Sequence, residues 1–582
     1  MTAQKFARVY WPKGFKHRRT AKLQYAQRKF RQKTIEESGA VKKSAWIIIG
    51  VVAIALAVLG FQKYKIYIPG VIANIKNPIA ANHEVVWQQD SDAPLAKSRP
   101  PNIILIVVDD LGMNDISLFG GGVAGGAVST PNINSIATEG VSFSNGYAAN
   151  ATCSPSRAAI MTGRYPTRFG FEFTAVPSAF ARTVGHANTK SPYPLIFHEE
   201  LAHDMMPYEQ MGVPASEITI AELLKTLDYR TIHLGKWHLG EAAEISPHGQ
   251  GFDYSLGFSA GASKFMREND ANVVNAKLPW DPIDRFLWPN LPYAVQFNGG
   301  QRFEPKGHMT DYLTDNALAA IEANKARPFF MYLAYNAVHT PLQATKADYD
   351  ALPQITDHTE RVYGAMVRQL DRRIGDILQK LKDSGIDDNT LVIFTSDNGG
   401  AWYAGLPNLN RPYRGWKATF FEGGIRVPLL MRWKGKIAPN SIRANLAGHL
   451  DLFETIAAAA GASSPKDRII DSRNLLGNGP PRQVFFWRSG GYRAVREGDW
   501  KLQIADRPNQ VWLYNLRNDP TEKNNLAASN PDKVAQLRAL IVAQNANMAN
   551  PQWPGLIEAP VRIDVPLNTP WDKNQEYVYW TN

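Results

Sequence analysis

Four oxygen-bearing side chains follow two short apolar runs that are typical of buried strands. Asp109 and Asp110 come directly after one run, and Asp397 and Asn398 follow the other after a single serine. Because the carboxyl ends of parallel strands face the ligand crevice of an α/β sheet, these side chains can converge there. Their oxygens suit a hard cation, Ca²⁺ or Mg²⁺, better than zinc or copper. Asp and Asn also cap helices and start turns, so each pair alone could be structural.

The chain has one cysteine, Cys153, in the segment ATCSPSRAAIMTGR (151–164). A lone cysteine is usually a small buried hydrophobic residue, and without a partner it forms no intramolecular disulfide. The segment nevertheless resembles the signature of the type I sulfatases, in which C-x-P-S-R followed by Leu-Thr-Gly-Arg directs oxidation of the cysteine to formylglycine. Met161 stands where that family usually has Leu, an exchange of similar volume.

The resemblance covers about residues 101 to 530 and extends to the other parts of the family's site, in the family's order. The matching segments are NIILIVVDDLGMND (102–115), GKWHLG (235–240), HTP (339–341), SDNGG (396–400), GWKATFFEGGIRVP (415–428) and LYNLRNDPTEKNNL (513–526). We therefore identify the chain as resembling an arylsulfatase-like member of the alkaline phosphatase superfamily.

The resemblance implies two sets of site residues. Taken singly, the histidines would more often be packing residues, and the lysines and the arginine would be solvated charges or surface ion pairs, so the inference rests on the whole set. The implied catalytic residues are Cys153, Arg157, Lys236, His238, His339 and Lys417. The implied metal ligands are Asp109, Asp110, Cys153, Asp397 and Asn398, holding one divalent cation, Ca²⁺ first and Mg²⁺ as the alternative.

The resemblance also implies a mechanism. Sulfate monoesters hydrolyse slowly because anionic sulfur repels nucleophiles and an alkoxide leaves poorly. A hydrated formylglycine, made by a formylglycine-generating maturase, would attack sulfur while Arg157 and Lys236 hold it. Lys417 would bind the sulfate oxygens, and His339 would protonate the departing alcohol. His238 would then take a proton from the second hydroxyl, which expels sulfate and restores the aldehyde.

Two other functions remain open from the sequence. One is hydrolysis of phosphonate monoesters or phosphodiesters by the same superfamily chemistry. The paired His238 and His339 with Lys417 favour the sulfatase, because they suit a singly charged ester with a basic leaving group. The other is an inactive, membrane-tethered binding protein in which Cys153 stays unmodified. Residues 165–215 and 255–309 are rich in aromatic residues and could wall the pocket, which suits either an aryl or a carbohydrate sulfate.

The elements that must position these residues are those of an α/β protein. Runs 103–108, 229–234, 329–335 and 391–395 predict buried parallel strands. Thr219 to Glu222 fits a capping box before a helix, and apolar residues spaced by four predict another helix over about 359–381. After about residue 481, alternating aromatic and polar residues predict a small antiparallel sheet with a helix near 531–544.

The net charge of +11 is concentrated at the N-terminus. Residues 1–43 hold 13 Lys and Arg against 2 acidic residues, and the remaining 539 residues hold 51 of each sign. The body of the protein therefore has no excess of positive charge with which to bind a polyanion, which argues against a nucleic-acid partner.

The uncharged run 45–61 has 17 residues, about the minimum to span a membrane as a helix. The long basic region before it and the lack of a small-residue cleavage site after it favour an uncleaved anchor over a signal peptide. The positive-inside rule then predicts a cytoplasmic N-terminus and an extracytoplasmic catalytic domain, periplasmic in a bacterium.

The sequence thus predicts five regions and an alkaline-phosphatase-like fold class: a large, mixed but mostly parallel sheet covered by helices, a small C-terminal antiparallel sheet with one helix, and one preceding transmembrane helix. The regions are a basic cytoplasmic tail (1–43), a transmembrane anchor (44–61), a stalk (62–100), a catalytic domain (101–480) and a C-terminal antiparallel subdomain with a tail (481–582).

Overall fold

The computed structural model describes residues 16–89, 99–187 and 191–582. The chain divides into two compact units, with the boundary between Ile68 and Pro69. The first unit contains the helix α1 (Lys16–Tyr64) and the short 3-10 helix η1 (Lys65–Tyr67). The second unit contains every predicted site residue.

The predicted membrane span over residues 44–61 lies inside α1. Within the part of the chain that the structure describes, no helix combines the length and apolar character needed to cross a membrane. The structure therefore does not support the predicted span, and the side chains at 44, 55–59 and 61 lie outside those described.

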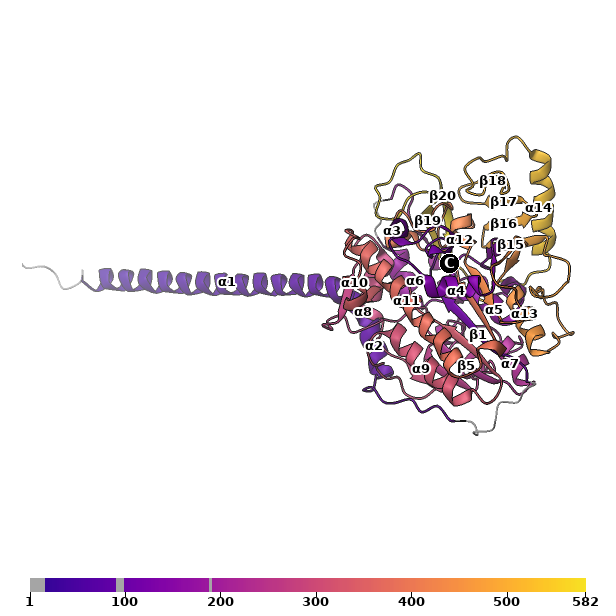
Figure 1. The fold of residues 1–582 in the computed structure, drawn as a ribbon. Coiled ribbons are helices and arrows are strands. Elements are labelled where there is room, and N and C mark those ends of the chain that lie inside the picture. The colour runs from indigo at the N-terminus through magenta and orange to yellow at the C-terminus, as the bar shows by residue number, and fades with distance from the viewer. Residues whose placement is uncertain (1–15, 90–98, 188–190) are drawn as a thin grey trace, which may run out of the picture. The chain divides into compact units, whose positions relative to one another are not determined.

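A nine-stranded mixed sheet forms the centre of the second unit (Figure 1). Its order is β13-β2-β12-β11-β1-β9-β5-β6-β8, and the five strands from β11 to β6 are parallel. The bounds are β1 (Asn102–Val108), β2 (Val141–Phe143), β5 (Arg230–Lys236), β6 (Tyr254–Phe258), β8 (Gln296–Phe297), β9 (Phe329–Ala334), β11 (Thr390–Ser396), β12 (Leu429–Arg432) and β13 (Ser441–Arg443).

Both faces of this sheet are covered, which explains why the central strands β1, β9 and β11 are buried at every position and mostly apolar. Alternate residues of β1 enter different cores: Ile104, Ile106 and Val108 lie in one, and Ile103, Leu105 and Val107 in the other. The first core is closed by α4 (Pro131–Thr138), α9 (Met309–Asn324) and α11 (His358–Asp383). The second is closed by α5 (Cys153–Thr162), α7 (Ile220–Lys225) and α13 (Asp451–Ala460).

The structure confirms the predicted strands and helices of the sheet domain. The four predicted strands are β1, β5, β9 and β11. The capping box is formed in α7, where the Thr219 hydroxyl accepts from the Glu222 backbone and the Glu222 carboxylate accepts from that of Thr219. Helix α11 buries its row of apolar residues spaced by four: Val362, Met366, Leu370, Ile374 and Leu378.

Smaller elements complete the covering layers. Two strand pairs are formed by β3 (Gly146–Tyr147) with β14 (Ala447–Gly448), and by β7 (Val273–Ala276) with β10 (Leu342–Thr345). The remaining short helices are α3 (Val123–Gly126), α6 (Ser178–Gly185), α8 (Pro282–Asn290), α10 (Lys346–Asp350) and α12 (Glu422–Ile425).

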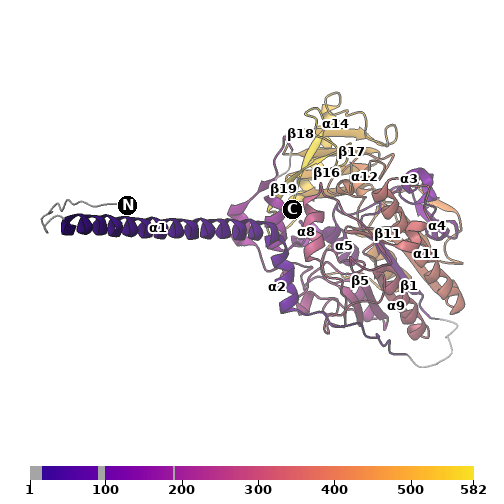
Figure 2. The same cartoon turned by 90° about the vertical axis from the view of Figure 1, so that its left-hand side faces the viewer.

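The predicted C-terminal sheet is also present, as the antiparallel meander β15 (Val484–Ser489), β16 (Tyr492–Glu497), β17 (Trp500–Ala505) and β18 (Gln510–Asn515). Helix α14 (Pro531–Asn545) packs on it (Figure 2). The sequence did not predict the following three-stranded sheet of β4 (Ile196–Phe197), β19 (Ile557–Arg562) and β20 (Tyr577–Thr581). Both small sheets share one apolar core with residues of the main domain, so they belong to the same compact unit.

The segment predicted to be a stalk, residues 62–100, is not wholly irregular. Its described part contains α2 (Ile68–Lys76), in which Gly70 lies against the backbone of Pro289. Farther on, Ala80 bridges to Phe303, and Trp87 is buried in the first core. The compact unit therefore starts about thirty residues earlier than the predicted catalytic domain, at Pro69.

A buried ion-pair cluster joins the C-terminal meander to α12. Lys501 Nζ lies 2.8 Å from Glu422 Oε1 and 3.0 Å from Glu522 Oε1, and all three side chains are fully buried. Lys501→Met should therefore lower the free energy of unfolding by about 3–5 kcal/mol, because Glu522 stays buried without its cation and Glu422 keeps only its ion pair with Arg426. Urea denaturation measures this loss. The matched control is Lys523→Met at an exposed position, and an equal, small effect of both substitutions would contradict the account.

Candidate active site

The two strand ends that carry the carboxylates lie side by side. Strands β1 and β11 pair in parallel with Val108 opposite Ser396, so Asp109 and Asp397 leave the sheet at the same edge. The Asp397 backbone N–H donates to Val108 O at 3.0 Å, and the Asp110 N–H lies 3.3 Å from Asp397 Oδ1. Parallel pairing thus brings together residues that are almost 290 positions apart, as the sequence predicts.

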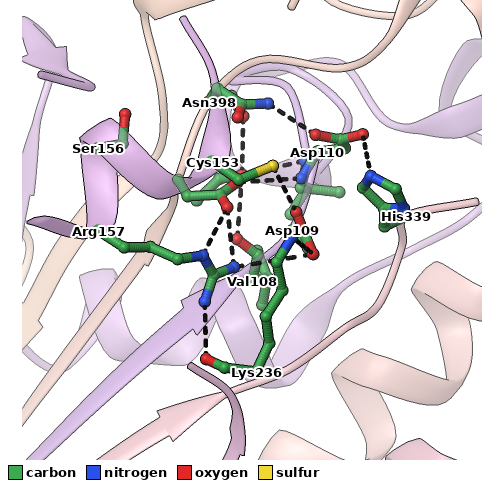
Figure 3. Close-up of polar contacts among 12 residues, drawn as sticks. Val108, Asp109, Asp110, Cys153, Ser156, Arg157, Lys236, His339 and Asn398 are labelled. Atoms are coloured by element: carbon green, nitrogen blue, oxygen red, sulfur yellow. Dashed lines mark hydrogen bonds and ion pairs between the residues drawn. The ribbon is translucent and has the colours of Figure 1, made fainter. Parts of the chain in front are cut away.

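Cys153 begins α5 and points its sulfur at this edge (Figure 3). Its Sγ lies 3.4 Å from Asp109 Oδ1 and 3.3 Å from Lys417 Nζ. The start of α5 is held by Ser156, whose hydroxyl donates to Asn150 O at 2.8 Å and accepts from the Asn150 N–H at 3.1 Å. The serine of the C-x-P-S-R segment therefore fixes the position of the cysteine.

Arg157 and Lys236 contact the carboxylates at this edge. Arg157 Nε donates to Asp397 Oδ2 at 2.9 Å, and the same guanidinium reaches the Lys236 carbonyl at 3.2 Å and the Tyr332 hydroxyl at 3.3 Å. Lys236 Nζ donates to Asp109 Oδ2 at 2.6 Å. Both cations are fully buried, so each is paired with a carboxylate where water cannot screen the attraction.

A second group of contacts surrounds Asp110. Lys417 Nζ lies 2.7 Å from its Oδ1, and Asn398 Nδ2 donates to the same oxygen at 2.7 Å. The Tyr403 hydroxyl donates to Asp110 Oδ2 at 2.9 Å, and His339 Nε2 lies 3.7 Å from that oxygen. Asp110 therefore lies between Lys417, which contacts Cys153, and His339.

The charges divide the three carboxylates. Burial, and then the neighbouring Asp397, raise the pKa of Asp109 to about 7. Burial also opposes ionisation of Asp397, but Arg157 and Lys236 outweigh it and hold the pKa of that carboxyl well below its usual range. The pKa of Asp110 is likewise lowered, because Lys417 outweighs the effect of burial. The neighbouring cations thus stabilise the charged forms of Asp110 and Asp397 more than that of Asp109. Asp109 is the carboxyl group of the three whose pKa is raised.

The donor set fits a hard divalent cation. One ligand atom each from Asp109, Asp110, Cys153 and His339 lie within 4.8 Å of one another. Asn398 Oδ1 is buried without a hydrogen-bond partner, and a cation would satisfy it. A divalent cation would also offset the raised proton affinity of Asp109, and oxygen ligands suit Ca²⁺ or Mg²⁺. This cluster contains His339, which was not among the predicted metal ligands. It does not contain the predicted ligand Asp397, which forms an ion pair with Arg157.

The two histidines are oriented by backbone carbonyls. His238 Nε2 lies 2.9 Å from Ala175 O, so that nitrogen carries the proton, and its Nδ1 is buried with no hydrogen-bond partner. His339 Nδ1 lies 2.6 Å from Thr340 O, which leaves Nε2 facing the site. Burial and, next, Lys417 lower the pKa of His339 to about 3, and burial lowers that of His238 strongly. Burial thus favours the neutral form of both rings.

Three site positions are backbone-strained. Asp110, His238 and Ala418, which follows Lys417, have positive φ values of 61°, 57° and 69°. Non-glycine residues rarely adopt this region, and such outliers cluster at functional sites where surrounding structure enforces them. The Asp110 backbone is held by Asp397 and Ala418 N–H donates to Ala151 O at 2.8 Å, so neighbouring loops enforce the strain.

The structure brings together all ten residues that the sequence analysis placed in the site, and each of them is buried. Sequence reasoning missed two tyrosines. Tyr403 contacts both Asp110 and Lys417 Nζ, at 2.9 and 3.1 Å, and Tyr332 contacts Arg157. Tyr332 faces inward from β9, and Tyr403 lies five residues after Asn398, so neither carried a signal beyond its nearness to predicted elements.

The comparisons with known proteins agree with this geometry. The model of the family described as Sulfatase matches residues 101–462, more than half of the chain. N-acetylgalactosamine-6-sulfatase of Mus musculus is 35% identical over 419 residues, which cover 70% of this chain and 72% of that protein. An arylsulfatase of Hemicentrotus pulcherrimus is 32% identical over 422 residues, covering 71% and 68%.

A solved structure shares the fold as well. The crystal structure of Ps i-CgsB in complex with k-i-k-neocarrahexaose superposes with a TM-score of 0.65 at 30% identity, covering 78% of this chain and 95% of that one. With the nucleophile position, buried cations and carboxylates in the family's order, these matches show that the chain belongs to the sulfatase family and is an enzyme that hydrolyses sulfate esters.

Proposed function

We propose that this enzyme cleaves sulfate monoesters with a formylglycine made from Cys153 and one divalent cation. The observation that carries the proposal is the position of Cys153 Sγ, 3.4 Å from a carboxylate of the candidate metal cluster and 3.3 Å from the Lys417 ammonium. Burial raises the pKa of the unmodified thiol, so the thiol itself is a poor nucleophile here. A hydroxyl group made from Cys153 would replace this weakly acidic thiol as the nucleophile.

The proposal requires a modification and an ion, each with a defined contribution. A hydrated aldehyde at position 153 would supply one hydroxyl that can attack sulfur and a second hydroxyl whose loss of a proton can expel sulfate and restore the aldehyde. A cation held by Asp109, Asp110, Asp397 and Asn398 supplies positive charge beside that nucleophile. We further propose a formylglycine-generating maturase as the partner that performs the oxidation.

The buried cations of the site have different tasks. Lys417 faces both Cys153 and Asp110, so its ammonium can bind a sulfate oxygen and offset the charge that builds up during attack. That Arg157 and Lys236 hold the hydrated aldehyde stays a prediction; in the structure each of them donates to a carboxylate, Arg157 to Asp397 and Lys236 to Asp109. In our account they hold those carboxylates ionised and in place.

The two histidines have separate tasks. His339 Nε2 faces the site, and an anionic ester beside it would raise the proton affinity of the ring, so that it can protonate the departing alcohol. His238 Nδ1 is unpaired while Nε2 is fixed on Ala175 O, which is the tautomer that a base requires. His238 can thus take the proton whose removal expels sulfate.

Cys153→Ala should abolish release of inorganic sulfate, because no nucleophile remains at position 153. Circular dichroism should show an unchanged fold, since the side chain is small. The matched control is Met161→Leu in the same buried helix, which restores the family's usual residue and should keep wild-type activity. Sulfate release by the Cys153→Ala protein at the wild-type rate would refute the role of this residue.

Exhaustive chelation should remove activity, and Ca²⁺ or Mg²⁺ should restore it better than Zn²⁺, because the donors are mainly oxygens. Full activity in metal-free enzyme, verified by elemental analysis, would exclude the cation.

Asp397→Ala should lower kcat/KM by more than about 100-fold, since it removes an anionic ligand and leaves Arg157 without this ion pair. Asp388→Ala is the control, because that side chain is 90% exposed.

His339→Ala should lose far more rate on alkyl sulfates than on nitrophenyl sulfate. A poorly basic phenoxide leaves without a proton, whereas an alkoxide needs one, and general acid catalysis commonly contributes about 10²- to 10⁴-fold. The defect on alkyl sulfates should fall in that range. Steady-state rates over a series of leaving groups measure it.

His238→Ala should behave differently, because this residue acts after the alcohol has departed. It should show a burst of alcohol followed by slow turnover, with little dependence on the leaving group. Rapid-mixing experiments resolve the burst. A burst from His339→Ala, or equal sensitivity of the two variants to leaving-group basicity, would mean that the assigned tasks are wrong.

We also propose that the catalytic unit lies outside the cytoplasm and that residues 44–61 attach the protein to a membrane. Trp46, Ile48 and Ile54 of α1 are 72%, 61% and 66% exposed, an apolar surface that water disfavours. The basic residues before this segment favour a cytoplasmic N-terminus. Protease given access to the extracytoplasmic face of the membrane should then digest the catalytic unit and spare the N-terminal segment. Protection of the catalytic unit, with a periplasmic control protein digested, would contradict the proposal.

A further inference from the structure

A cavity of about 250 Å³ opens from the reacting groups. At one end it is lined by Cys153, His238, His339 and Lys417, the residues assigned above to the reaction. The departing alcohol of a bound ester must therefore occupy the rest of this cavity. The chemistry of the remaining lining decides which alcohols fit.

Beyond the reacting end, the wall is built from α6 and α8 and is apolar. Its side chains are Phe180 and Val184 of α6 and Ile283, Phe286 and Leu287 of α8, with Val176 just before α6. The rings of Phe180 and Phe286 meet edge to face with centroids 5.3 Å apart, which ties the two helices together. This side of the cavity is a packed hydrophobic surface with defined aromatic contacts.

Strand β19, which packs beside α6, and its neighbour β20 continue this apolar lining. Ile557 and Ala559 of β19 and Trp580 of β20 line the cavity, and Trp402 closes it near the reacting end. Ile557 and Val184 are buried in one apolar cluster, which is separate from the two cores that cover the main sheet. The three-stranded sheet at the end of the chain therefore supplies part of the substrate pocket.

Polar groups in this outer wall are few and mostly already paired. Among the described lining residues, Asn582 Oδ1 accepts from the Thr174 N–H at 2.8 Å, and Tyr208 is hydrogen-bonded to the Gly261 backbone. Thr174 Oγ1 is the polar atom there that is buried without a partner. A sugar ring carries several hydroxyls, and each one that loses water without gaining a partner weakens binding by roughly 10-fold or more.

We infer that the natural substrate is the sulfate ester of an apolar alcohol, aryl or alicyclic, and not of a carbohydrate. This inference rests on the proposed function, because it takes the end of the cavity at Cys153 as the place where sulfur is attacked. The apolar wall gains free energy from a hydrophobic ring that it removes from water. It offers a polyhydroxylated ring almost no hydrogen bonds.

A matched pair of esters tests the inference. Cyclohexylmethyl sulfate and N-acetylgalactosamine 6-sulfate both carry sulfate on a CH₂ attached to a six-membered ring, so leaving-group basicity is similar and ring polarity differs. Wild-type kcat/KM should be at least about 100-fold higher for the cyclohexylmethyl ester. Equal or faster turnover of the sugar ester would overturn the inference.

Binding to the Cys153→Ala protein separates this inference from the proposed function. Calorimetry should show tighter binding of the cyclohexylmethyl ester, by at least about 10-fold, whether or not the wild-type enzyme turns either ester over. Binding preference without any turnover would defeat the proposed function and leave the pocket assignment standing. Tighter binding of the sugar ester would defeat the pocket assignment.

Wall variants complete the test. Phe180→Asn and Ile283→Asn replace half-buried side chains, so the fold should tolerate them, and each should lower kcat/KM for the cyclohexylmethyl ester by about 10-fold or more. The matched control is Leu318→Asn, a half-buried leucine of α9 outside the cavity lining, which should keep wild-type selectivity. Unchanged selectivity of both wall variants would overturn the inference.

Discussion

Three carboxylates buried at one edge of a parallel sheet are the constraint on which the rest of this structure depends. Asp109, Asp110 and Asp397 are at most 4% exposed on a side-chain basis, and buried anions are tolerated only when cations and hydrogen bonds compensate them. The compensating groups are brought by separate parts of the chain: Arg157 by α5, Lys236 by the end of β5 and Lys417 by a strained loop. Ion pairs at the active site therefore join parts of the chain that are far apart in sequence.

This balance of charges also explains the position of the nucleophile. Cys153 lies between Asp109 and Lys417, so an oxygen nucleophile at this position would face an anionic ligand on one side and a cation on the other. A thiol gains little there, because burial disfavours its charged form. The surroundings are thus better suited to an oxygen nucleophile assisted by a metal than to a cysteine acting alone.

Much of the fold and nearly all of the site could be predicted because both have local signals. Apolar runs gave β1 and β11, and the polar residues that follow them are where parallel pairing places a site. Tyr403 was missed because its role depends on a loop conformation that brings its hydroxyl to Asp110. The sheet containing β19 was missed because its partner β4 has only two residues and lies some 360 residues away in the chain. The membrane span was predicted from the uncharged run 45–61 and its basic flank, and no helix among the described residues is long and apolar enough to confirm it.

The central claim is that catalysis depends on the aldehyde form of residue 153. It is tested most directly by mass spectrometry of the peptide that carries this residue, in enzyme preparations with graded degrees of oxidation. Specific activity should rise in proportion to the aldehyde fraction, on a line that passes through zero when only thiol is present. Appreciable turnover by a preparation shown to contain only the unmodified thiol would contradict the account.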